Sequence, residues 1–106
     1  MAHPIYFLFL ARPKRSWYEL SEKERQAMDA KIRKSLADVG AKVVLGADCS
    51  WSSGQWQFFG VEEYPDIEAL QKHVATQHEI GFSQHMEELD FLGSPMPPSA
   101  SPSAQR

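Results

Sequence analysis

Two hydrophobic periods alternate along this chain, and their order constrains the fold more than any other feature. Strand-like apolar runs occur at residues 5–11, 42–47, 55–63 and 84–93. Helical periodicity occurs at residues 16–39 and 66–78. The resulting order, β-α-β-β-α-β, is the split βαβ arrangement. It predicts an α+β fold in which a four-stranded antiparallel sheet carries two helices on one face.

The first strand-like run is apolar at nearly every position from Ile5 to Ala11. Because successive side chains of a strand point to opposite faces, such a run predicts a central strand that is buried on both faces. The run at 55–63 is similar, since Phe59 and Val61 alternate with Phe58. Two helices cover only one face of a sheet, and an apolar second face would not persist in a soluble monomer. The sequence therefore predicts a homodimer.

Capping residues place the ends of the helices. Two capping-box signals, Ser16 to Glu19 and Ser21 to Glu24, overlap at the start of the first helical segment. We expect a short turn near residues 17–20 and a main helix from Ser21 to Gly40, where glycine ends it. The second helix is expected to begin at the N-cap Asp66 and to end at Gly81. The last strand is less apolar than the first, which predicts an edge strand.

Length and composition indicate one domain, at residues 1–93 of 106. From Ser94 the chain is rich in proline and serine, and we expect residues 94–106 to form a disordered tail. A net charge of -3 argues against nucleic-acid binding, and no apolar run is long enough for a membrane span. A single cysteine, Cys49, excludes an internal disulfide and favours a cytoplasmic protein.

Three local patterns accompany the order of elements: the entry to the first helix, the end of the third strand, and the link to the fourth. They comprise Trp17, Leu20, Ser21, Glu24 and Arg25, then residues 62–70, then Gly81, Phe82, His85–Glu88 and Phe91–Gly93. With them, residues 3–93 resemble the ferredoxin-like dimeric α/β-barrel superfamily, above all its small uncharacterised bacterial members. The resemblance implies that two subunits pack sheet against sheet and that small ligands lie between sheet and helices. Such proteins include cofactor-free monooxygenases, isomerases, haem-degrading enzymes and proteins without known activity.

A histidine is the leading candidate for chemistry. His78 continues the apolar stripe of the second helix, so its ring is expected to point toward the sheet and could transfer protons there. The alternative is a helix-end histidine satisfied by a carbonyl or by the helix dipole. His73 flanks the stripe and could assist, as could Asp48 after the second strand. Asp48 also fits an ordinary turn.

No metal site is predicted. His73 and His78 are five residues apart, a spacing that does not place both rings on one helical face. A haem bound by one histidine is still an alternative, because a single axial ligand produces no characteristic spacing in a sequence. Cys49 lacks a neighbouring group that would activate its thiol as a nucleophile.

Aromatic side chains with polar tips could line a pocket for a flat organic ligand. The candidates are Trp17, Trp51, Trp56 and Tyr6. Core or interface packing is the alternative, and it is favoured for Trp17 and Trp56. Glu88 and Asp90 alternate along the last strand and share a face, which on an edge strand is typical of a solvated surface.

Together these patterns predict a small cytoplasmic, metal-free enzyme that acts on a small cyclic or aromatic molecule. His78 would transfer the proton, and oxygenation or isomerisation is implied by the resemblance alone. The alternative is a non-catalytic homodimer that binds a small ligand or scaffolds a partner.

Overall fold

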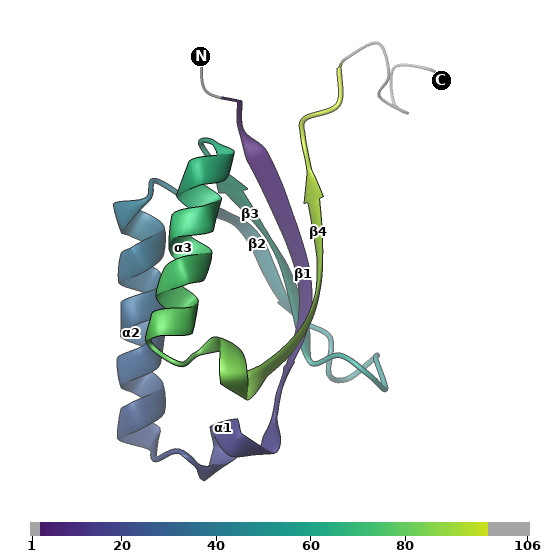
Figure 1. Ribbon diagram of the computed structural model, residues 1–106. Coiled ribbons are helices and arrows are strands. Elements are labelled where there is room, and N and C mark those ends of the chain that lie inside the picture. Colours follow the sequence, from purple (N-terminus) through teal and green to yellow (C-terminus); the bar gives the residue numbers. More distant parts are fainter. Residues whose placement is uncertain (1–2, 98–106) are drawn as a thin grey trace.

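The computed structural model describes residues 3–97 and contains every predicted helix and strand (Figure 1). In chain order the elements are β1 (Ile5–Pro13), α1 (Arg15–Glu19), α2 (Glu22–Asp38), β2 (Lys42–Asp48), β3 (Phe58–Tyr64), α3 (Ile67–Glu79), the 3-10 turn η1 (Ser83–His85) and β4 (Met86–Gly93). Within the described residues, no helix is both long and apolar enough to cross a bilayer.

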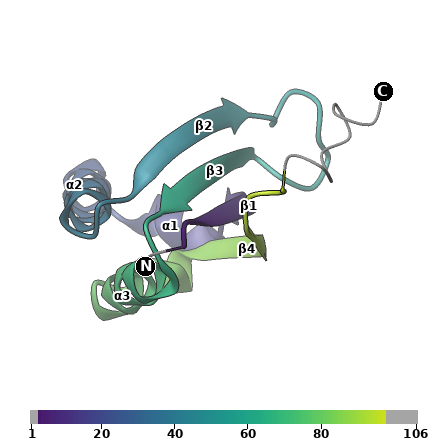
Figure 2. The same ribbon diagram turned by 90° about the horizontal axis from the view of Figure 1, so that it is seen from above.

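The four strands form one antiparallel sheet in the order β2-β3-β1-β4. The predicted fold class and the central position of β1 are therefore confirmed, and β4 is an edge strand as predicted. Helices α2 and α3 lie side by side over one face of the sheet, which we call the helix face (Figures 1 and 2). The opposite face, which we call the open face, is covered by no helix or strand of residues 3–97 (Figure 2).

The helix ends follow the predicted chemistry, with one exception. Ser21 forms the complete capping box with Glu24 at the start of α2, and Asp66 caps α3 by accepting a hydrogen bond from the Ala69 amide at 2.8 Å. Glycines with φ of 76° and 79° follow α2 and α3 at Gly40 and Gly81. The predicted box at Ser16 is wrong.

Ser16 does not cap α1, because the N-cap of that helix is Lys14 and it makes no side-chain cap. The Ser16 hydroxyl instead forms a 2.8 Å hydrogen bond with Nδ1 of His85, which lies 69 residues further along the chain. Local spacing favoured a cap, but the tertiary partner takes the hydroxyl and ties α1 to η1.

Two strand boundaries also differ from prediction. β3 begins at Phe58 rather than at residue 55, because the Ser53 hydroxyl accepts bonds from the Gln55 and Trp56 amides and turns the chain there. β4 begins at Met86, after η1. Residues 94–97 are exposed and irregular, while the rest of the predicted tail lies outside the described residues.

Alternation along β1 assigns its side chains to the two faces. Phe7 and Phe9 point to the helix face, and Leu8 points to the open face, where it is 37% exposed. Cross-strand register places further apolar side chains on the open face: Leu10, Leu45, Phe59, Val61, Leu89 and Phe91. The predicted apolar second face is thus present.

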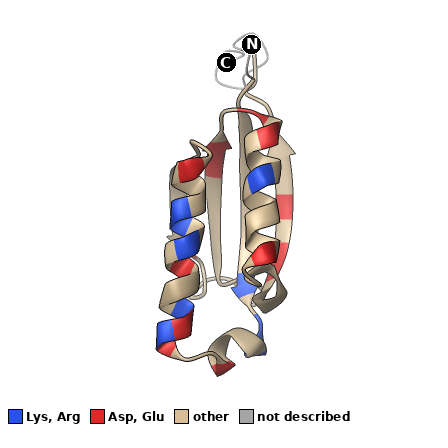
Figure 3. Cartoon of the chain, turned by 60° about the vertical axis from the view of Figure 1, so that its left-hand side comes forward, with Lys and Arg blue, Asp and Glu red and all other residues tan. Residues whose placement is uncertain are grey.

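The helix face is buried most completely where the end of β3 packs against the first two turns of α3. Tyr64 and His73 are enclosed there and Leu70 is nearly so, while Ala11 and Met86 are buried at the other end of the sheet. The outer surfaces of α2 and α3 carry charges of both signs, and acidic residues also mark β4 (Figure 3). Charged residues are therefore found on the edge strand β4 as well as on the outer surfaces of the helices.

Candidate functional site

A cavity lies between the helix face and α3, and we call it the helix-side cavity. It has two adjoining lobes of about 110 and 250 Å³ that share Phe7, Gln77, Met86 and Glu88. The smaller lobe is also lined by Phe9, Ile32, Phe58, Glu62 and Phe82. The larger is also lined by Val74, His78, Ser83 and Asp90. Such a mainly apolar concavity with a few convergent polar groups is the usual form of a small-molecule site.

The strand register places three carboxyl groups around the phenyl rings of β1. Glu62 of β3 pairs with Phe7, and Asp90 of β4 pairs with Phe9. Residues paired across a ladder share a face, so both carboxyl groups flank the rings on the helix face. Glu88 lies two residues before Asp90 on β4 and points to the same side. Phenyl rings therefore form the floor, with acids on both sides.

These carboxyl groups hold protons more tightly than usual. Burial first, then the charge and hydrogen bonding of Asp90 and the charge of Glu62, raise the pKa of Glu88 to about 7. Burial also raises the pKa of Asp90 and that of Glu62. Both Glu88 and Asp90 keep contact with solvent at the β4 edge, and a carboxyl group with a pKa of about 7 can take up or release a proton near neutral pH.

A second set of polar groups lies next to the cavity and forms hydrogen bonds with two of its lining residues, Glu62 and Gln77. The Tyr64 hydroxyl donates to Oε1 of Glu62 at 2.6 Å, and its ring lies 6.0 Å from that of His73. His73 contacts the Ser35 hydroxyl at 2.8 Å through Nδ1 and the Gln77 amide at 3.3 Å through Nε2. Burial lowers the pKa of His73, so its ring is neutral at pH 7. This histidine joins α2 to α3.

The two candidate histidines of α3 are placed differently from the prediction. His78 is exposed and lies at the rim of the larger lobe, rather than under the helix. His73 is the residue that points to the sheet, with 1% of its surface exposed. The inward side of α3 runs through Leu70, His73 and Gln77, because a period of 3.6 residues carries position 78 away from the sheet.

The remaining predicted site residues do not line the helix-side cavity. Asp48 accepts two hydrogen bonds from Ser50, at 2.8 Å from its amide and 2.6 Å from its hydroxyl, so it forms the turn that was the alternative interpretation. Those bonds lower the pKa of Asp48. Tyr6 lies on the open face beside Glu63, whose charge raises the pKa of the phenol.

The tryptophans lie outside the cavity as well. Trp17 packs edge-on against Phe82 at 5.7 Å between ring centroids, behind the wall of the smaller lobe. Trp56 stacks under the guanidinium of Arg12 at 5.7 Å. Trp51 is 85% exposed in the loop between β2 and β3. The structure thus brings none of the three into a common pocket with the histidines.

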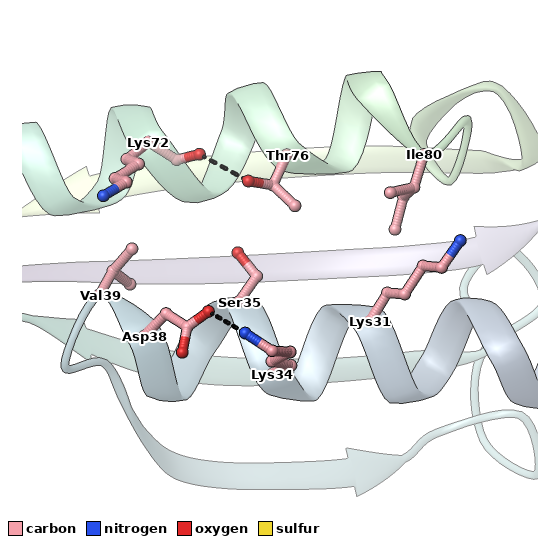
Figure 4. Close-up of a pocket in the computed structure, with 8 residues that line it drawn as sticks. All are labelled: Lys31, Lys34, Ser35, Asp38, Val39, Lys72, Thr76 and Ile80. Atoms are coloured by element: carbon pink, nitrogen blue, oxygen red, sulfur yellow. Dashed lines mark hydrogen bonds and ion pairs between the residues drawn. The ribbon is translucent and has the colours of Figure 1, made fainter.

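A separate groove of about 270 Å³ runs between the outer sides of α2 and α3 (Figure 4). Three lysines line it, but Lys34 is paired with Asp38 at 2.8 Å. The amines of Lys31 and Lys72 point toward opposite ends of the groove (Figure 4). Because Lys34 is neutralised by Asp38 and the other two lysine amines point apart, the groove has no set of cationic groups that converge on one ligand position.

Sequence reasoning missed the residues that form the cavity. Phe7, Phe9 and Phe58 were expected only as core, and Glu88 and Asp90 as a solvated edge. The available signal was the alternation of acids on a strand beside an apolar central strand. Its meaning depends on which face meets the helices, and alternation alone does not tell that.

The histidines do not fit an axial role toward haem. Both ring nitrogens of His73 are hydrogen-bonded within the core, and His85 is bonded to Ser16 through Nδ1 while its Nε2 lies 3.4 Å from the Gln84 amide. His78 faces a lobe of about 250 Å³ whose charged lining is acidic, which opposes the propionates of haem. Among residues 3–97 no group of three or more His, Cys, Asp or Glu is placed to hold a metal ion.

Comparison with known proteins finds structural likeness without sequence kinship. No family model and no curated protein matches the chain. A chlorite dismutase variant from Candidatus Nitrospira defluvii superposes with a TM-score of 0.73 at 10% identity, covering 93% of this chain and 42% of that one. RPA0582, a protein of unknown function from Rhodopseudomonas palustris, superposes with a TM-score of 0.67 at 19% identity, covering 92% of this chain and 86% of that one.

These likenesses show the fold. The chain has the ferredoxin-like α+β fold that the resemblance to dimeric α/β-barrel proteins implied. It spans about two-fifths of the length of the chlorite dismutase chain, whereas RPA0582 is of similar size. Identities of 10% and 19% carry no activity across.

Proposed function

We propose that this protein is a homodimeric enzyme that binds a small cyclic or aromatic molecule in the helix-side cavity and exchanges a proton with it through Glu88. The observation that carries the proposal is a carboxyl group with a pKa of about 7 in a cavity walled by phenyl rings. Strongly shifted groups in concave sites are common at active sites. A group that titrates near the working pH transfers protons most efficiently.

Each neighbour of Glu88 has a role in this proposal. Asp90 helps to raise the pKa of Glu88 through its charge and hydrogen bonding. His78, the leading candidate from the sequence, lies at the mouth, where it could pass the proton to solvent. His73 positions Gln77 by a hydrogen bond and does not touch the cavity itself. Asp48, Trp51 and Trp56 have no part in it.

Proton transfer at carbon serves either reaction class that the resemblance implies. An isomerase moves a proton between two carbons, and oxygenation of an acidic organic substrate begins with loss of a proton. The likeness to a chlorite dismutase raises haem as a cofactor, but the bonded histidines and the acidic lining do not fit it. We derive no step through haem.

Dimerisation follows from the open face. Leu8, Phe59, Leu89 and Phe91 are each at least 37% exposed there, beside further apolar side chains of the same sheet. A contiguous apolar surface of this kind marks a protein interface, and a symmetric copy covers it with the same residues. The single cysteine, Cys49, is free, which is consistent with a cytoplasmic protein.

The test is a screen of cyclic and aromatic compounds by NMR, with the amide signals of Phe7, Gln77 and Met86 as reporters. Binding should shift these signals and leave those of the α2–α3 groove unchanged. For a compound that is turned over, Glu88→Gln should lower kcat by about 10²- to 10⁴-fold, the usual contribution of a general acid or base. Binding without turnover of any compound would favour the non-catalytic ligand-binding alternative, and the absence of binding would contradict both.

A further inference from the structure

The charges around the helix-side cavity have one sign. Its lining contains Glu62, Glu88 and Asp90, and among the described residues that line it there is no Lys or Arg. His78, at the rim, is the one other titratable group in that lining. None of the three carboxyl groups forms an ion pair within residues 3–97. An anion entering this cavity would meet three carboxyl groups and, among the described lining residues, no Lys or Arg to offset them.

The carboxyl groups come from opposite sides of the ligand space. Glu62 lies on β3 and Asp90 on β4, with the phenyl rings of Phe7 and Phe9 on β1 between them. The register fixes the backbone positions of these residues and directs their side chains to the same face of the sheet. A flat molecule lying on the rings therefore has a carboxyl group at each edge.

Aromatic rings add a second preference for positive charge. The smaller lobe is lined by four of them, Phe7, Phe9, Phe58 and Phe82. The face of a phenyl ring attracts a cation through its quadrupole, most strongly where water is excluded. An alkyl or aryl ammonium group is therefore favoured both by the walls and by the acids, whereas a neutral molecule gains only from the walls.

We propose that the ligand of the helix-side cavity is a small organic amine that binds as its ammonium ion, with the Glu88–Asp90 pair and Glu62 around the positive charge and the phenyl rings against its apolar part. The inference rests on the proposed function and narrows its substrate class. An organic cation fits better than a metal ion, because the lining beside these carboxyl groups is largely phenyl rings, and among residues 3–97 no group of three or more His, Cys, Asp or Glu is placed to hold a metal ion.

A consequence is that the amine replaces the proton on Glu88. Without a ligand, burial and then the charge of Asp90 leave Glu88 about half protonated at pH 7. A bound ammonium supplies the positive charge and releases that proton. Because the pKa of Glu88 is about 7, about half a proton should leave per molecule bound at pH 7.

The test compares benzylamine, benzyl alcohol and benzoate, which have nearly the same shape and differ in charge. Thermal shift and NMR titration of the full chain should rank benzylamine above benzyl alcohol, with no binding of benzoate. Calorimetry at pH 7 in buffers of different ionisation enthalpy should show release of about half a proton with benzylamine. Glu88→Gln should weaken benzylamine binding at least about tenfold and abolish the proton release, with a much smaller effect on benzyl alcohol.

Controls separate charge selection from folding. Glu87→Gln changes a carboxyl group on the same strand that points to the open face and pairs with Arg12, so it should leave all three affinities unchanged. Asp90→Asn should reproduce the loss if Glu88→Gln does not fold. Binding of benzoate as tight as that of benzylamine, or equal binding of amine and alcohol without proton release, would overturn the amine assignment and leave small-molecule binding standing. Failure of all three probes to bind would contradict the proposed function itself.

Discussion

The two faces of this sheet are built from the same strands, yet they distribute polarity in the reverse of the usual way. The helix face is covered by α2 and α3, and it holds Glu62, Glu88 and Asp90 among its phenyl rings. No helix or strand of residues 3–97 covers the open face, and its β1 side chains are Leu8 and Leu10 in the middle, with Tyr6 and Arg12 toward the ends. Glu62 is half-buried, while Glu88 and Asp90 are exposed at the β4 edge of the covered face. Acids at the edge of a covered face and apolar side chains on a bare one make sense if the first binds a ligand and the second binds another subunit.

The difference shows how function is separated within one small sheet. Side chains at even positions of β1 face the open side, and those at odd positions face the helices. One substitution on a strand therefore acts on a single face, and its neighbour serves as the control for the other. Measurements on such neighbours can separate assembly from ligand binding.

Tyr64→Ala should have the largest effect, because it acts where the helix face is fully enclosed. Tyr64 is 0% exposed, packs edge-on against Phe7 at 6.5 Å and donates a hydrogen bond to Glu62. Its removal should lower the free energy of unfolding by about 3–5 kcal/mol in urea melts. Phe91→Ala, on the open face and 56% exposed, should cost less than about 1 kcal/mol in the monomer. Equal losses would show that the two faces are not distinct.

Leu8→Asp should break the dimer and leave the fold intact. Leu8 lies in the middle of the open face, between Val61 and Phe91 in the register, and is 37% exposed. A carboxylate buried without a partner at an interface costs about 3 kcal/mol, so the dissociation constant should rise at least about 100-fold. Light scattering across a dilution series would report the change.

The matched control is Ile67→Asp, because Ile67 is 38% exposed but lies in the first turn of α3. An acid is favourable at that helix end, so this variant should keep the mass of the wild type. A wild-type protein with the light-scattering mass of a 12.0 kDa monomer at high concentration would contradict the proposed dimer.

Local chemistry made much of the fold predictable, and long-range contacts explain what was not. The ends of α2 and α3 follow from Ser21 and Asp66, whose partners lie within three residues. Ser16 failed as a cap because its partner, His85, is distant in the chain. No pattern of spacing shows such a contact.

The candidate site was less predictable than the fold for a related reason. The predicted stripe included His78, but the inward side of α3 is centred on Leu70, His73 and Gln77, which leaves position 78 at the exposed edge of the helix. The sequence predicts that Glu88 and Asp90 share one face of β4, but it does not tell whether that face meets the helices. Site residues from separate strands meet only through the register.

Gly60→Ala should disturb the helix face alone, by a smaller amount. A Cβ atom at Gly60 would lie 2.7 Å from the Phe9 ring and 3.0 Å from the Leu45 carbonyl oxygen, so the ring that floors the cavity must move. We expect a loss of about 1–3 kcal/mol in unfolding free energy and weaker ligand binding. Gly46 pairs with Gly60 across the ladder, and a Cβ atom there meets nothing within 4 Å. Gly46→Ala should therefore be nearly neutral, and equal effects would argue against ring displacement.

The smallest expected effect is a change in how stability depends on pH. The folded protein raises the pKa of Glu88 from 4.5 to about 7, so between these values the folded state holds a proton that the unfolded state has lost. Stability from this group is complete below pH 4.5 and is lost as the pH rises through about 7. Glu62, Asp90 and His78 are the titratable groups that line the cavity with it.

Glu88→Gln has no proton to lose, so its stability relative to wild type should improve by about 1 kcal/mol between pH 5 and pH 8, after allowance for the solvent contact of an edge strand. Urea melts at fixed protein concentration would measure the difference, and Glu87→Gln on the open face should show none. His73 changes the stability in the opposite direction. Burial lowers the pKa of His73, so the stability that its neutral ring contributes to the fold is lost as the pH falls below the usual histidine range. That loss is common to both proteins and cancels in their difference. A flat difference across pH 5–8 would mean that Glu88 titrates as an ordinary surface acid, and the contrast between an acidic covered face and an apolar open one would lose its functional meaning.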